Sequence, residues 1–187
     1  LQGAIDLCHQ HGALFVLDEM ITGFRWHNGG AQTLYGIEPD LSTFGKGIGN
    51  GFAVSALVGK PQIMELGGLR HDQERVFLLS TTHGAETHSL AAAMATMRTY
   101  QEQDVIGHMH RKGEQLAAGV RQVAAELGIE PYFQVAGRAC NLIFVTRDAK
   151  EERSQVFRTL FMQETIRRGL LMPSFVISYA HGDRDVE

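Results

Sequence analysis

Residues 13–20 read ALFVLDEM, residues 41–51 read LSTFGKGIGNG, and these two stretches decide the fold. The apolar run at 13–17 follows a helical pattern and a glycine, which is typical of a parallel strand covered on both faces. Further strand patterns lie at 41–45, 53–59 and 75–81, and helical patterns lie at 1–11, 31–35, 61–66 and 87–103. Because helix and strand alternate over residues 1–100, we predict an α/β unit with a mostly parallel sheet.

The pattern changes after about residue 103. Asp104 is the predicted N-cap of a long amphipathic helix over 105–127. The remaining segments are strand-like at 132–137, 141–146 and 170–179 and helical at 151–168. This order predicts a small α+β unit, so we divide the chain into residues 1–103 and 104–187.

Composition excludes several classes of protein. Hydrophobic residues make up 44% and charged residues 20%, which excludes a disordered, collagenous or coiled-coil chain. The net charge of -4, with scattered basic residues, argues against a nucleic-acid or anionic-membrane surface. No apolar run approaches the roughly 18 residues of a membrane span. Cys8 and Cys140 are too few and too far apart for a disulfide framework or a zinc site, which favours a reduced, cytoplasmic setting.

Both ends of the chain read as cut. The first residue is Leu1, and residues 1–11 resemble the middle of a packed helix. The sequence stops soon after the strand pattern at 170–179. We therefore expect a fragment of a longer polypeptide.

Two features follow predicted strands, where open α/β sheets place their ligand sites. Asp18 is the last residue of the first predicted strand. A carboxylate there requires a nearby cation or a strong hydrogen-bond donor, unless it caps the next turn. The hydroxyl-rich segment STTHGAETHS (80–89) precedes an alanine-rich helix. A helix N-terminus of this kind favours a phosphate, and ordinary capping by Thr82 or Thr87 is the alternative.

Lys46 is the third feature, because glycines at 45, 47, 49 and 51 surround it directly after a strand. A lysine amine held in a partly buried turn can attack a carbonyl and form a Schiff base. A flexible surface turn and a phosphate-binding loop are the alternatives. The phosphate-loop pattern requires Ser or Thr after the lysine, whereas Gly47 follows Lys46.

Metal and serine-hydrolase chemistry find no support in the pattern. The pairs His9/His11 and His108/His110 are two residues apart, so each pair points to different faces of a helix. The Gly-x-Ser-x-Gly pattern of a serine nucleophile is absent from the sequence. We therefore predict no metal ligands among the nine histidines.

Three segments together resemble one known family. They are VLDEMITGFR (16–25), GGAQTLYGIEPDLSTFGKGIGNGFAVSALVGK (29–60) and STTHGAETHSLAAA (80–93). They resemble the class III, fold type I aminotransferases that use pyridoxal 5'-phosphate, in particular the glutamate-1-semialdehyde 2,1-aminomutase branch. The resemblance implies the large α/β domain of that fold, with a mostly parallel sheet that is partial here, followed by the small α+β C-terminal domain. It also implies a cytoplasmic homodimer with a shared active site.

The resemblance also implies residue roles. Lys46 would form the Schiff base with the cofactor and carry the proton between the substrate and cofactor carbons. Asp18 would pair with the pyridine nitrogen and keep it protonated, which makes the ring an electron sink. Met20 would pack on the ring, and Thr82 would bind the cofactor phosphate of the neighbouring subunit.

The segment after the lysine departs from the aminomutase pattern. The aminomutase reads nearer to GKIIGGGLPVGA, whereas this chain reads GKGIGNGFAVSAL. The predicted reaction is therefore amino-group transfer or a 2,1-amino shift on a small amino-acid-like or amino-carbonyl substrate. A nucleotide- or phosphate-binding module that uses residues 45–51 without covalent chemistry is the alternative.

Overall fold

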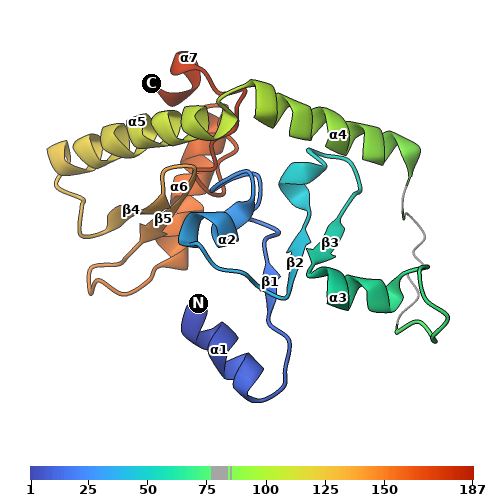
Figure 1. Ribbon diagram of the computed structural model, residues 1–187. Helices are drawn as coiled ribbons and strands as arrows, with labels where there is room; N and C mark the ends of the chain where they lie inside the picture. The colour runs from blue at the N-terminus through green and yellow to red at the C-terminus, as the bar shows by residue number, and fades with distance from the viewer. Residues whose placement is uncertain (77–83, 85) are drawn as a thin grey trace. The chain divides into compact units, whose positions relative to one another are not determined.

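The computed structural model describes residues 1–76, 84 and 86–187. These residues form two compact units, Leu1–Gln103 and Asp104–Glu187. Each unit combines helices with a small sheet (Figure 1). Among the described residues, no helix is long and apolar enough to cross a membrane.

Among the described residues, the sheet of the first unit has three strands, with β2 (Leu41–Phe44) between β1 (Val16–Asp18) and β3 (Ala56–Gly59) (Figure 1). The strands β1 and β2 are parallel, with Asp18 opposite Thr43. The strand β3 runs antiparallel to β2. A parallel partner requires a long crossover, whereas the short β2–β3 connection contains only the 3-10 turn η1 (Lys46–Ile48).

Helices flank these strands in the chain. They are α1 (Gln2–Gln10), α2 (Gly30–Tyr35), α3 (Pro61–Met64), the 3-10 turn η2 (Glu65–Gly67) and α4 (Thr87–Glu102). Their positions agree with the sequence pattern to within a few residues. The strand predicted at 75–81 falls mostly outside the described residues.

A buried carboxylate, that of Asp40, links the elements at the edge of the sheet where β1 and β2 begin. Asp40 is 4% exposed and directly precedes β2. Its Oδ1 accepts from Lys60 Nζ at 2.7 Å, and its Oδ2 lies 2.8 Å from both His9 Nε2 and the Phe15 backbone nitrogen. The Lys60 hydrogen bond, followed by those from Phe15 and His9, holds the pKa of Asp40 well below its usual range. One side chain thus connects α1, the start of β1 and the end of β3.

We expect Asp40→Asn to destabilise the protein by about 1.5–3 kcal/mol at neutral pH, because the substitution removes the charged acceptor of the hydrogen bonds from Lys60, Phe15 and His9. The depressed pKa means that the stabilisation is complete above the unfolded-state value of about 4 and is lost as the pH falls below it. Urea unfolding measured between about pH 7 and pH 3 should show the wild type and variant converging. The exposed neighbour Glu38 supplies the control, Glu38→Gln. A difference that stays constant with pH would contradict this role.

The second unit is built on a hairpin. The strands β4 (Phe133–Arg138) and β5 (Asn141–Thr146) pair antiparallel, and the helices α5 (Val105–Glu126) and α6 (Gln155–Arg167) pack on them. The short helix α7 (Asp183–Val186) contacts α5. The core consists of Ala117, Phe133, Leu142, Phe144 and Phe175.

The N-cap predicted for the long helix is confirmed, because the Asp104 carboxylate accepts from the Gly107 backbone nitrogen at 3.1 Å. The strand predicted at 170–179 is wrong. Only an isolated bridge between Leu142 and Phe175 forms there. Pro173 lies within the segment, and proline has no backbone N–H to donate to a ladder. Phe175 and Ile177 of the segment are still buried, at 2% and 3% exposure, whereas Leu170 and Leu171 are exposed.

Candidate active site

Asp18 lies at the carboxyl end of β1 and is exposed. Its Oδ1 accepts from the Met20 backbone nitrogen at 2.8 Å and from Thr43 Oγ1 at 3.3 Å. Both hydrogen bonds that it makes within the described residues use Oδ1, so Oδ2 stays available to an external donor. The Met20 and Thr43 donors fix the carboxylate at the strand end without neutralising it.

Lys46 lies two residues beyond β2, the parallel neighbour of β1. It begins the turn η1 with φ at 47°, a left-handed conformation that is uncommon for a residue with a side chain. Its ammonium makes no hydrogen bond or ion pair within the described residues. Asp18 and Lys46 therefore come from adjacent parallel strands at the same edge of the sheet, where α/β folds bind ligands.

The other lysines of the chain are placed differently. Lys60 binds Asp40, and Lys112 forms an ion pair with Asp183 in the second unit. Lys150 lies in an exposed turn of the second unit. Lys46 is thus the lysine that lies at the carboxyl edge of the sheet and whose amine has no partner among the described residues.

The glycines beside Lys46 are closely packed. A Cβ added to Gly45 would lie 2.4 Å from Met20 Sδ, so the Met20 side chain would have to move. A Cβ on Gly47 would lie 3.2 Å from Phe24 Cβ. The segment that follows β1 therefore packs on both sides of Lys46 and supports the turn.

Glu19 is the residue that sequence reasoning missed. It is fully buried, and its carboxylate accepts from the Ala31 and Gln32 backbone nitrogens, both at 2.8 Å, and from the Thr22 hydroxyl. Glu19 therefore satisfies backbone N–H groups at the N-terminus of α2. Gly30 adopts φ of 80° beside it, and a Cβ there would lie 2.4 Å from Glu19 Cδ.

The signal for Glu19 was present in the sequence as a second carboxylate directly after the strand, followed by a glycine pair at 29–30. It was not decisive, because only the tertiary structure shows which of the two carboxylates turns inward. Asp18 itself accepts from the Met20 backbone nitrogen in the turn that directly follows, as the capping alternative expected, and this bond uses only Oδ1. Its remaining hydrogen-bonding capacity is then available to a ligand.

The segment at 80–89 is only partly described. Thr82 lies outside the described residues. Thr87 is the first residue of α4 and so lies inside the helix, while the N-cap residue is Glu86, whose side chain makes no capping hydrogen bond. Capping by Thr87, one of the alternatives, is therefore wrong.

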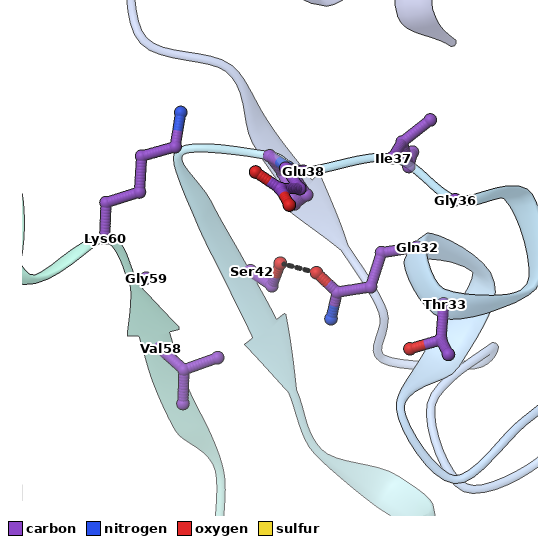
Figure 2. Close-up of a pocket in the computed structure, with 10 residues that line it drawn as sticks. Gln32, Thr33, Gly36, Ile37, Glu38, Ser42, Val58, Gly59 and Lys60 are labelled. Atoms are coloured by element: carbon purple, nitrogen blue, oxygen red, sulfur yellow. Dashed lines mark hydrogen bonds between the residues drawn. The ribbon is translucent and has the colours of Figure 1, made fainter.

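A hollow of about 670 Å³ lies elsewhere on the first unit. It is lined by the end of α2, the loop that follows and the end of β3, with Gln32, Ser42 and Lys60 among its residues (Figure 2). Ser42 Oγ donates to Gln32 Oε1 at 2.9 Å inside it. Its lining includes neither Asp18 nor Lys46, so we do not assign the chemistry to it. No group of three His, Cys, Asp or Glu among the described residues is placed to hold a metal ion.

Comparison with known proteins identifies the family of this chain. The model of the class-III aminotransferase family matches residues 1–175. The chain belongs to this family. Its membership agrees with the fold class expected from the sequence, an α/β unit of the fold type I kind followed by an α+β unit.

Relatives of this class-III aminotransferase chain include two kinds of enzyme. The 3-aminobutyryl-CoA aminotransferase of Cloacimonas acidaminovorans (strain Evry) is 32% identical over 189 residues, which cover 100% of this chain and 44% of that protein. The glutamate-1-semialdehyde 2,1-aminomutase of Desulfatibacillum aliphaticivorans is also 32% identical, over 198 residues, covering 100% of this chain and 45% of that protein. The chain thus spans less than half the length of these relatives.

A solved structure shows the same fold. The FumI protein of Sphingopyxis sp. MTA144, described in its PLP internal aldimine form, superposes with a TM-score of 0.84 at 26% identity. The match covers 99% of this chain and 42% of that chain. The arrangement of helices and strands in this class-III aminotransferase chain is therefore shared with a protein whose structure was solved in a PLP internal aldimine form.

Proposed function

We propose that this chain is part of a pyridoxal 5'-phosphate-dependent enzyme that transfers or shifts an amino group on a small amino-acid-like or amino-carbonyl substrate. The observation that carries the proposal is the placement of Asp18 and Lys46 at the carboxyl ends of two adjacent parallel strands. Family membership and the relatives' names support the same reaction class.

The residues present fit this cofactor. Lys46 offers an unpaired amine for its aldehyde, and Asp18 offers a carboxylate oxygen for its ring nitrogen. Packing of Met20 Sδ against Gly45 brings the Met20 segment to the base of the lysine turn. Met20 would contact the ring, and Thr82 would bind the phosphate of the neighbouring subunit.

The proposed roles of Asp18 and Lys46 follow from the chemistry of this cofactor. When bound, the cofactor supplies a protonated pyridine ring that withdraws electrons from the carbon losing its proton. Asp18 would keep the proton on the ring nitrogen, because a carboxylate beside that nitrogen favours its charged form. Lys46 Nζ would hold the cofactor covalently and then, as a free amine, move the proton between the two reacting carbons.

The organisation of the whole protein is part of the proposal. Residues 1–103 would be the C-terminal part of the cofactor-binding large domain, and residues 104–187 most of the small C-terminal domain. The enzyme would be a cytoplasmic homodimer that shares its active sites. Transfer to a keto acid and an intramolecular 2,1-shift both fit the proposed site, and the relatives include enzymes of both kinds.

Borohydride reduction of the whole protein loaded with cofactor tests this function. We expect a pyridoxyl adduct on the peptide that contains Lys46 and none on the peptides that contain Lys60 or Lys112, because carboxylates already bind those two amines. Mass spectrometry of the digested protein locates the adduct. Nucleotide binding that depends on Lys46, without any adduct, would instead support a phosphate-binding module.

A further inference from the structure

Phe24 adopts an unusual backbone conformation beside the lysine turn. Its φ is 57°, in the left-handed region that a side chain disfavours. Its Cβ lies next to Gly47, and its ring meets Phe44 edge-on, with ring centroids 6.2 Å apart. Phe24 therefore contacts both the end of β2 and the residue that follows Lys46. Its conformation persists only if the surroundings hold it in place.

Tyr100, near the end of α4, supplies such a restraint. Its hydroxyl donates to the Phe24 backbone oxygen at 2.6 Å, and its ring meets the Phe24 ring edge-on at 5.5 Å. Burial raises the pKa of the Tyr100 hydroxyl above its ordinary value, against the opposing charge of Arg25. The hydroxyl therefore stays protonated and remains a donor at neutral pH.

The helix α4 brings this restraint to the lysine turn. Ser89 and Ala93 are the buried residues of α4, and separations of four and eleven residues place Ala93 and Tyr100 on the same helix face as Ser89. The helix also contacts the turn η1. Asn28 Nδ2 donates to the Tyr100 backbone oxygen at 3.4 Å, which ties the same part of α4 to the segment that follows Phe24.

We propose that Tyr100 is a positioning residue for Lys46, because its hydroxyl locks Phe24 in the conformation that supports the lysine turn through Gly47. This inference rests on the proposed role of Lys46. The chain of contacts runs from the Tyr100 hydroxyl to the Phe24 carbonyl, and from Phe24 Cβ to Gly47. Tyr100 itself touches neither substrate nor cofactor in this assignment.

Tyr100→Phe in the whole protein tests the proposal, because the substitution removes one oxygen and keeps the ring. In the cofactor-free protein, we expect the backbone amides at 45–50 to exchange with deuterium roughly fivefold faster in Tyr100→Phe than in the wild type. A factor of about five corresponds to the net free energy of one hydrogen bond. The rate at which added pyridoxal 5'-phosphate becomes trapped on Lys46 by borohydride should fall by a similar factor. Tyr35→Phe is the matched control, since the exposed Tyr35 hydroxyl makes no hydrogen bond within the described residues.

Gly47→Ala is a second variant, and it alters the contact between Phe24 and Gly47 at the Gly47 position. It should also accelerate amide exchange at 45–50, since its Cβ would press on Phe24. Unchanged exchange in Tyr100→Phe would overturn the positioning role, and so would unchanged trapping on Lys46. If the wild type shows no adduct on Lys46, the proposed function fails. Amide exchange at 45–50 in Tyr100→Phe then still decides whether Tyr100 supports the lysine turn.

Discussion

Lys46→Ala is expected to lower the rate of the proposed amino transfer by the whole protein about 10⁴-fold or more, because in the proposed site one side chain would supply both the covalent link to the cofactor and the proton carrier. The residual rate should be measured in single turnovers with cofactor in excess. Lys150→Ala is the matched control, since Lys150 also lies in an exposed turn but in the second unit. That variant should retain the wild-type rate.

A small primary amine added to Lys46→Ala should restore part of the lost rate, because it replaces the missing Nζ as a proton carrier. A folding defect would not respond to the amine. The urea midpoint of the variant should also stay close to that of the wild type, since the Lys46 ammonium has no partner within the described residues. Undiminished turnover in Lys46→Ala would refute the assignment of this lysine.

Asp18→Asn is expected to preserve the covalent link to Lys46 and to lower the rate of proton removal from the substrate about 10²–10⁴-fold, within the range typical of an essential proton-transfer group. The amide is neutral, so it cannot hold the ring nitrogen in its charged form. Substrate deuterated at the carbon that loses its proton should then show a larger kinetic isotope effect. That readout identifies proton removal as the slowed step.

The control for Asp18 is Asp6→Asn, an exposed aspartate of α1 that accepts from Gln2 Nε2 at 2.9 Å. It should leave the rate and the isotope effect unchanged. Borohydride trapping on Lys46 should persist in Asp18→Asn, which separates loss of chemistry from loss of cofactor binding. Near-normal turnover in Asp18→Asn would show that another group protonates the ring.

Much of the fold could be predicted because its signals are local. The apolar run before Asp18 and the glycine-framed segment around Lys46 predict strand ends, and the structure places both residues at one edge of the sheet. The long helix was predictable because Asp104 marks its start and an amphipathic pattern fills it. Signals of this kind depend on neighbours within a few residues in the sequence.

The features that could not be predicted depend on distant residues. The segment at 170–179 has the apolar content of a strand, but Pro173 limits its pairing while the core still buries Phe175. The inward turn of Glu19 depends on the α2 backbone 12 and 13 residues further along the chain. The contact of Tyr100 with Phe24 spans 76 residues. No short pattern in the sequence encodes these partners.

The packing of Met20 against Gly45 has a consequence for how this family can vary. The two positions share one volume, since a methyl group on residue 45 would overlap the sulfur of residue 20. A larger residue at 45 would therefore displace the Met20 side chain or require a smaller residue at 20, so substitutions at the two positions are expected to be coupled. An engineer who reshapes Met20, the proposed ring-contacting residue, would also be setting which residues fit at position 45.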